Sequence, residues 1–219
     1  MTAAPATKSP ITVIKAFDQE LYARDFLESG SFIVRELRRY RTMEESFRRD
    51  PTEGEAHFEF PDQRTPCITF YPDAEPTVSQ QPGMMHVQSS LGNAILVFCA
   101  SLPDVNPEYL RGKFGKFLVE IGDLSQFNID IQRGIEAAGY SLIARTEGVP
   151  VEYTKGDAVA RDLSLRAGSR LSYIQKPRKF SKEQEFRFVS KLNLQTRPFD
   201  LPDYVRIKLG ARISYAKLL

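Results

Sequence analysis

The sequence has few of the residues on which most metal sites and disulfide frameworks depend. Its 219 residues include no tryptophan, two histidines and two cysteines. Cys67 and Cys99 are therefore expected to be reduced thiols of a cytoplasmic protein. Together with His57 and His86 they lack the close paired spacing of structural zinc sites, so no metal is expected.

Long apolar runs and a dominant charge are absent as well. No stretch approaches the roughly 20 apolar residues that a membrane-spanning helix needs, and the longest run, Ala94–Ala100, has the length of a strand. The 30 lysines and arginines are balanced by 28 aspartates and glutamates. We therefore expect no membrane association, and any nucleic-acid contact has to depend on a local patch.

Several common catalytic motifs are missing. There is no GxxxxGK[ST] loop, no GxGxxG after a strand and no GxSxG elbow. The two histidines offer few candidates for acid/base catalysis. His57 alternates with phenylalanines and His86 lies between Met85 and Val87, which favours structural roles for both.

The composition is that of a globular chain, with 42% hydrophobic and 26% charged residues. Residues 1–10 are predicted to form a flexible tail and residues 11–219 a single α+β domain. Strands outnumber helices, and hairpin-like connections outnumber βαβ units. This balance favours a mainly antiparallel sheet with a few flanking helices.

Hydrophobic periodicity and turn residues locate the elements. Gly30 and Gly139 are expected to end the two longer helices. Pro103 and Pro107 are expected to break the chain. Helices are predicted over 17–30, 123–138 and 157–165, strands over 31–37, 55–60, 67–71, 84–90, 93–101, 116–121, 183–192 and 205–209, and a hairpin over 140–146 and 149–154 that turns at Glu147-Gly148. The predicted core includes Phe32, Val34, Leu96, Phe98, Phe117, Val119, Phe186 and Phe188.

A segment rich in arginine and glutamate, Tyr40–Gly54, follows the strand predicted over 31–37. A solvated, charged helix is one interpretation of its composition. The functional interpretation is a rim that holds a phosphate or carboxylate, because guanidinium groups bind such oxygens in pairs.

A pair of glutamates, Glu183 and Glu185, opens a late strand. Their spacing predicts that both point to one polar face, with Phe186 on the core face. Repulsion between the carboxylates is expected to raise one pKa and so leave one acid and one base. The alternative is a solvent-facing strand with Arg187 and Lys182 as partners. On the polar strand face of the functional interpretation, Glu185→Gln is expected to leave stability nearly unchanged.

The order of these pieces resembles the ADP-ribosyltransferase superfamily. That family has an arginine or histidine on an early strand, a serine or tyrosine on a middle strand, and a late glutamate in a Glu-x-Glu or Gln-x-Glu pattern. The corresponding residues here are Arg35, Arg38 or Arg41 early, Ser101 (or Ser89 and Ser90) in the middle, and Glu183-Gln184-Glu185 late. The chain also resembles an uncharacterised bacterial group with early Tyr-Arg…Asp…Glu-Gly and late Glu-x-Glu-x-Arg stretches.

The resemblance implies NAD as a substrate and assigns roles to named residues. Glu185 is the implied catalytic glutamate, which binds the ribose hydroxyl of NAD, and Glu183 orients or deprotonates the acceptor. Arg38, Arg41, Tyr40 and Ser101 are the implied NAD-binding residues, with Tyr71 and Phe98 as further aromatic walls.

Two hypotheses from different classes follow. The first is a transferase that cleaves the nicotinamide–ribose bond of NAD and passes ADP-ribose to a protein or nucleic acid, as a bacterial toxin or phage-defence factor. It requires that Glu185 and at least one of Arg35, Arg38 and Arg41 line the same pocket. The alternative is a non-enzymatic accessory protein of bacterial defence that contacts an acidic partner or nucleic acid through Arg38–Arg49.

Overall fold

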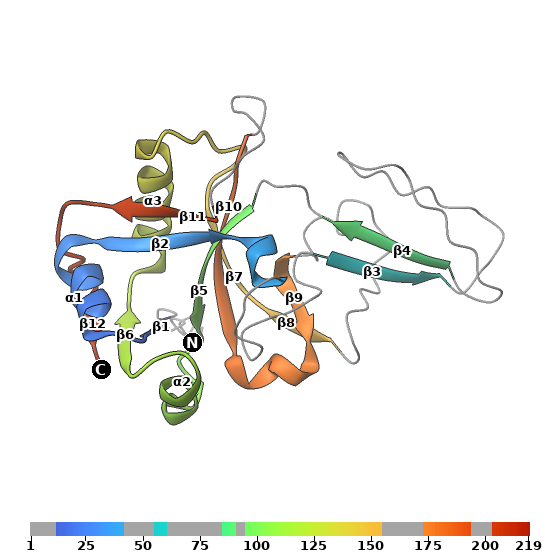
Figure 1. Ribbon diagram of the computed structural model, residues 1–219, viewed down its shortest axis with the longest axis horizontal. Helices are drawn as coiled ribbons and strands as arrows, with labels where there is room; N and C mark the ends of the chain where they lie inside the picture. Colours follow the sequence, from blue (N-terminus) through green and yellow to red (C-terminus); the bar gives the residue numbers. More distant parts are fainter. Residues whose placement is uncertain (1–11, 42–54, 61–84, 91–94, 155–172, 194–202) are drawn as a thin grey trace, which may run out of the picture.

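A computed structural model describes residues 12–41, 55–60, 85–90, 95–154, 173–193 and 203–219, the second and third of these ranges by their backbone alone. The expected fold class is confirmed. One eight-stranded sheet, antiparallel at every pairing, is accompanied by a few helices (Figure 1). None of the described helices is long and apolar enough to cross a membrane.

Strand β5 (Ile95–Ser101) lies at the centre of the sheet and is almost entirely buried. Its apolar sequence explains this position, because a strand covered on both faces has no polar side to present. Along one edge it pairs over its full length with β10 (Glu185–Lys191). Strand β10 pairs in turn with β7 (Glu147–Pro150) on its other edge.

The opposite edge of β5 is shared by two strands that diverge. Strand β2 (Ser31–Glu36) pairs with its beginning, and β1 (Val13–Phe17) pairs only with its last residue, through Ile14 opposite Ser101. Strand β2 continues the sheet to β11 (Tyr204–Lys208), whereas β1 continues it to β6 (Phe117–Ile121) and β12 (Ala216–Leu218). The sheet is therefore forked (Figure 1). None of the described strands pairs with this edge of β5 at Cys99.

Helices α1 (Glu20–Ser29) and α3 (Leu124–Ala137) pack apolar side chains against those of the sheet to form the main core. Helix α1 ends at Gly30, whose φ of 61° suits glycine, and a Cβ there would lie 2.7 Å from the Cβ of Leu209. Helix α3 begins at Asp123, whose carboxylate accepts a hydrogen bond from the Gln126 backbone N–H. The predicted core residues are buried, apart from the partly buried Phe117.

The hairpin predicted over 140–154 is wrong. Strand β7 pairs with β10 rather than with 140–146, and β8 (Glu152–Thr154) pairs in parallel with β9 (Gln175–Pro177). Gly148 is not a turn residue: a Cβ there would lie 3.0 Å from the Phe186 ring, so glycine allows β7 to approach β10 closely.

Pro107 begins a helix instead of only breaking the chain. Helix α2 (Pro107–Lys113) has proline in its first turn, where its missing N–H is not needed. The Asn106 side chain accepts hydrogen bonds from the N–H groups of Glu108 and Tyr109. This helix supplies one residue of the candidate site.

The remaining predictions have mixed outcomes. Strands β3 (Glu55–Phe60) and β4 (Met85–Ser90) are confirmed and pair with each other. Strands β1, β9 and β12 were not predicted, and neither were the 3₁₀ helices η1 (Leu37–Arg41) and η2 (Arg178–Glu183). The predicted tail over 1–10, the strand over 67–71 and the helix over 157–165 lie outside the described residues.

Candidate functional site

A cavity of about 550 Å³ occupies the fork between β1 and β2. Its volume is within the range of small-molecule binding sites. The walls come from segments far apart in sequence, namely β1, α1, β2, η1, β5, α2, β9, η2, β10 and β11. The polar side chains that line it are Lys15, Asp18, Tyr22, Asp25, Ser31, Arg35, Tyr40, Cys99, Ser101, Lys176, Glu183, Glu185, Tyr204 and Arg206.

Most of the residues singled out by sequence lie in this one cavity. Glu185 and Arg35 both line it, as the transferase hypothesis requires, and so do Tyr40, Ser101 and Glu183. Phe98 lines it too, although its ring also packs in the aromatic core. Outside the described side chains lie those of Arg38, Arg41, Tyr71, Ser89 and Ser90.

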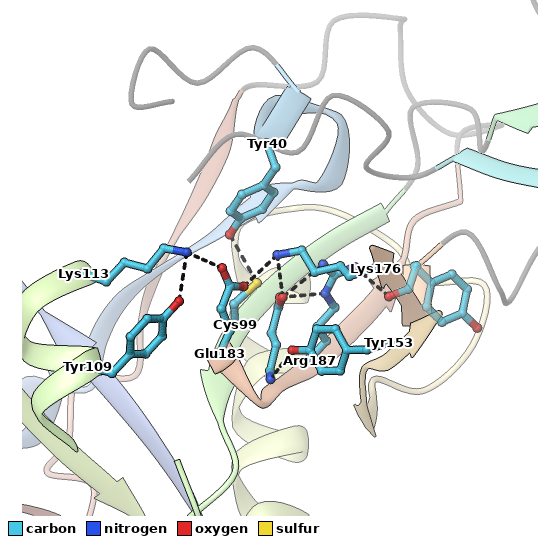
Figure 2. Close-up of polar contacts among 10 residues, drawn as sticks. Tyr40, Cys99, Tyr109, Lys113, Tyr153, Lys176, Glu183 and Arg187 are labelled. Atoms are coloured by element: carbon cyan, nitrogen blue, oxygen red, sulfur yellow. Dashed lines mark hydrogen bonds and ion pairs between the residues drawn. The ribbon is translucent and has the colours of Figure 1, made fainter. Parts of the chain in front are cut away.

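The two glutamates do not share a strand. Glu183 ends η2, Glu185 begins β10, and Gln184 between them is left-handed, with a φ of 42°. Both carboxylates nevertheless reach one ammonium group, because Lys176 Nζ lies 3.0 Å from Glu183 Oε2 and 2.8 Å from Glu185 Oε2 (Figure 2). The predicted common strand face is therefore wrong, and the turn at Gln184 brings the carboxylates together instead.

Glu185 is a buried, fully paired carboxylate. Arg187 Nε lies 2.7 Å from its Oε1, in addition to the contact with Lys176. Burial alone raises the pKa of Glu185, but the charges and hydrogen bonds of Arg187 and Lys176 outweigh it and hold that pKa well below its usual range. The expected rise through repulsion is wrong for Glu185. The expected polar, solvent-facing surface is wrong too, because Glu185 and Arg187 are both buried.

Glu183 extends the same network toward α2. Its Oε1 lies 2.7 Å from Lys113 Nζ, so both of its oxygens are engaged. Lys113, Glu183, Lys176, Glu185 and Arg187 form one ion-pair chain (Figure 2). Three cations and two carboxylates give it one net positive charge. An anion in the cavity is therefore attracted to this ion-pair chain.

The pairing of Glu185 predicts a loss of stability in acid. Its pKa in the folded protein is below the value of about 4.3 for an unfolded glutamate, so its contribution is complete above about pH 5 and is lost as the pH falls toward the folded-state pKa. Urea unfolding should give a smaller free energy at about pH 3 than at about pH 5, and Glu185→Gln should show a smaller difference over this interval. Equal differences for both proteins would contradict the assignment.

Two tyrosines support the ion-pair chain from outside the cavity. The Tyr153 hydroxyl accepts a hydrogen bond of 2.7 Å from the Glu185 backbone N–H, and Arg187 donates to the backbone oxygen of Tyr173 at 2.8 Å. Burial, followed by the charge of Glu185 and that of Glu183, raises the pKa of Tyr153, so its hydroxyl stays protonated. These contacts fix the backbone and the guanidinium beside Glu185.

Cys99 and Lys15 occupy the fork itself. Lys15 donates from Nζ to the backbone oxygen of Cys99 at 2.8 Å, which takes the place of a strand partner. The thiol donates to the Tyr40 hydroxyl at 3.4 Å. Burial and the charge of Glu185 raise the pKa of Cys99 to about 12. The thiol is therefore protonated at neutral pH.

Cys99 should react slowly with thiol reagents. Its pKa rises from 9.0 to about 12, so far less of the reactive thiolate is present at pH 8. In a Cys67→Ser protein, which retains this thiol alone, labelling of the native state should be roughly a hundredfold or more slower than labelling in denaturant. Equal rates would show that the thiol is accessible and normally acidic.

Several residues of the site were not identified from the sequence. Lys113, Lys176 and Arg187 were not proposed as site residues, because their partners are fixed only by the fold. A lysine inside the apolar stretch Val13–Phe17 is a signal that could have identified Lys15. Among the described residues there is no cluster of three or more histidine, cysteine, aspartate or glutamate side chains that could hold a metal.

No family model, curated protein or solved structure matches the chain.

Proposed function

We propose that the protein is an NAD-dependent transferase that cleaves the nicotinamide–ribose bond and passes ADP-ribose to a protein or nucleic acid. The observation that carries the proposal is the convergence of Arg35, Ser101 and Glu185 in one cavity. They come from β2, β5 and β10, which are widely separated in sequence. This is the order of residues on which the resemblance to ADP-ribosyltransferases depends.

The chemistry of the cavity is suited to this reaction. Arg35 and Lys176 supply cations for the pyrophosphate, and Tyr40 supplies an aromatic wall. Because its pKa is low, Glu185 is an anion at neutral pH and can stabilise the cationic ribose that develops as nicotinamide leaves. In the proposed complex the pyrophosphate competes for Lys176, which leaves more of the Glu185 charge for the ribose.

Nicotinamide release from NAD, measured on the full chain, tests the proposal. Arg35→Gln is the first variant, because Arg35 is partly buried and forms no ion pair within the described residues. Losing a charged hydrogen bond of this kind should lower release by roughly tenfold or more. Lys191→Gln is the matched control, since Lys191 lies on β10 outside the cavity, and it should release nicotinamide like the wild type.

Glu185→Gln is the second variant and should lower the rate by roughly a hundredfold or more. It has to be assayed below its own melting temperature, because the substitution removes one charge from a buried ion pair. Wild-type protein that neither binds NAD nor releases nicotinamide, with protein and nucleic-acid acceptors supplied, would overturn the proposal. That result would favour the non-enzymatic binding protein.

A further inference from the structure

We infer that the β2–β11 wall of the cavity binds a single-stranded nucleic acid and that this strand is the acceptor of the transfer. The inference rests on the proposed function, whose acceptor class it specifies. The wall is defined here as the outward face of these two strands. It consists of Ser31, Ile33 and Arg35 on β2 and Tyr204, Arg206 and Lys208 on β11.

Strand register places these side chains on one face. Tyr204 lies opposite Arg35, Arg206 opposite Ile33, and Lys208 opposite Ser31. Residues that are directly opposite each other in a pair of strands point to the same side. The burial of β11 alternates, with Tyr204, Arg206 and Lys208 exposed, and five of the six residues line the cavity. The wall therefore runs from the candidate site to the edge of the sheet.

The charge of the wall is entirely positive. Arg35 lies over the Tyr204 ring, 5.9 Å from the guanidinium carbon to the centroid. Neither Arg206 nor Lys208 forms an ion pair within the described residues. The neighbouring Asp203 is paired with Arg39. Arginine and lysine side chains in this arrangement are available for a chain of phosphates.

Two acidic side chains of the cavity belong neither to the ion-pair chain nor to the β2–β11 wall. Asp18 and Asp25 belong to the segment that joins β1 to β2 through α1. Their two negative charges are outnumbered by the three cations of the β2–β11 wall, which is therefore the favourable side of the cavity for a polyanion.

The exposed aromatic ring favours a single strand over an acidic protein. Tyr204 is half-exposed, between Arg35 across the strand pair and Arg206 along its own strand. A ring flanked by cations can stack an unpaired base while the cations hold the adjoining phosphates. An acidic peptide uses the cations but has no planar base to stack on Tyr204. A duplex keeps its bases stacked on one another.

The transfer of ADP-ribose needs no reactant other than NAD and the single-stranded nucleic acid. A nucleophilic nitrogen or oxygen of a base forms a bond to the anomeric carbon of the NAD ribose. The bond from that carbon to nicotinamide breaks, and its electron pair leaves with nicotinamide. The proton of the nucleophile passes to solvent.

The test is the anisotropy of a fluorescent single-stranded oligonucleotide of roughly 16 nucleotides, titrated with the full chain over a range of salt. Without NAD, Arg35 is available to the oligonucleotide, and contacts from Arg35, Arg206 and Lys208 predict a slope of log K against log salt of about −2. Arg206→Gln and Lys208→Gln should each reduce the magnitude of the slope by about 0.7. Tyr204→Ala should weaken binding roughly five- to hundredfold. Lys217→Gln, on β12 at the other end of the sheet, is the charge-matched control and should bind like the wild type.

Each outcome has a definite meaning. Binding at least as tight to a duplex, or competition by polyglutamate as effective as by unlabelled oligonucleotide, overturns the inference. Nicotinamide release without oligonucleotide binding overturns it too, but leaves the proposed function standing. Oligonucleotide binding without any nicotinamide release supports the β2–β11 wall as a nucleic-acid binding site but overturns its role as the acceptor site. ADP-ribose found on the oligonucleotide supports both.

Discussion

Replacing Arg187 by methionine should lower the free energy of unfolding by about 3–5 kcal/mol. Arg187 is 1% exposed, binds Glu185 through two nitrogens and donates to the backbone of Tyr173. Methionine fills part of the space. It leaves the Glu185 carboxylate without its closest cation and the Tyr173 backbone oxygen without its hydrogen-bond donor. Removal of one partner of a buried pair is costly for this reason, even where the intact pair adds little stability. Urea unfolding monitored by circular dichroism measures the loss.

Arg24→Met is the matched control for Arg187→Met. Arg24 forms an ion pair of 2.7 Å with Glu20, but its side chain is 64% exposed. Solvent screens such pairs, so the loss should be about 1 kcal/mol or less. The double variant Glu185→Leu with Arg187→Met should lose less stability than the sum of the single variants. Similar small losses for Arg187→Met and Arg24→Met would mean that the buried pair does not form.

Phe127→Ala should cost about 3–5 kcal/mol, whatever the function of the protein. The Phe127 ring contacts those of Phe26, Phe32, Phe98 and Phe188, with centroids 4.9–5.8 Å apart. It joins α3 to both α1 and the sheet, so alanine leaves a cavity that no single element can fill. Thermal or urea unfolding would show the loss as a lower melting temperature or midpoint.

Ile129→Ala provides the control on the same helix. Ile129 is 45% exposed, so its truncation should change the unfolding free energy by about 0.5 kcal/mol or less. If Phe127→Ala were no worse than Ile129→Ala, the assignment of the faces of α3 would be wrong.

Local sequence patterns predicted the helices and strands that can be identified without knowing which element they pack against. Helix α3 combines an apolar stripe with an aspartate cap and a following glycine, and β5 has a continuous apolar run. Strand β7 shows the limit. Its sequence suits a turn, but the edge of β10, nearly 40 residues later, provides a better partner. Such a partner is invisible to a local pattern because the pairing energy is non-local.

The candidate site divides in the same way. The Glu-x-Glu pattern pointed to Glu185, and the early arginines left Arg35, Arg38 and Arg41 open; of these four residues Glu185 and Arg35 line the cavity, and the side chains of Arg38 and Arg41 lie outside those described. The state of Glu185 could not be predicted, because its pKa depends on Lys176 and Arg187 in three-dimensional contact. Lys113 is 70 residues from Glu183 in the sequence, so its place in the ion-pair chain could not be predicted either. The pKa and the ion-pair partners of a charged residue depend on its neighbours in the folded structure. The sequence alone does not identify these neighbours.

The forked sheet has a consequence for the inner surface of the cavity. Strands β1 and β2 both pair with β5 but not with each other, through Ile14 with Ser101 on one side and Arg35 with Val97 and Glu36 with Leu96 on the other. Between these pairs β5 keeps β10 along one edge, but its other edge has no strand partner among the described residues. The fork thus brings the backbone of a central strand to the cavity, and a side chain, Lys15, binds the Cys99 oxygen there.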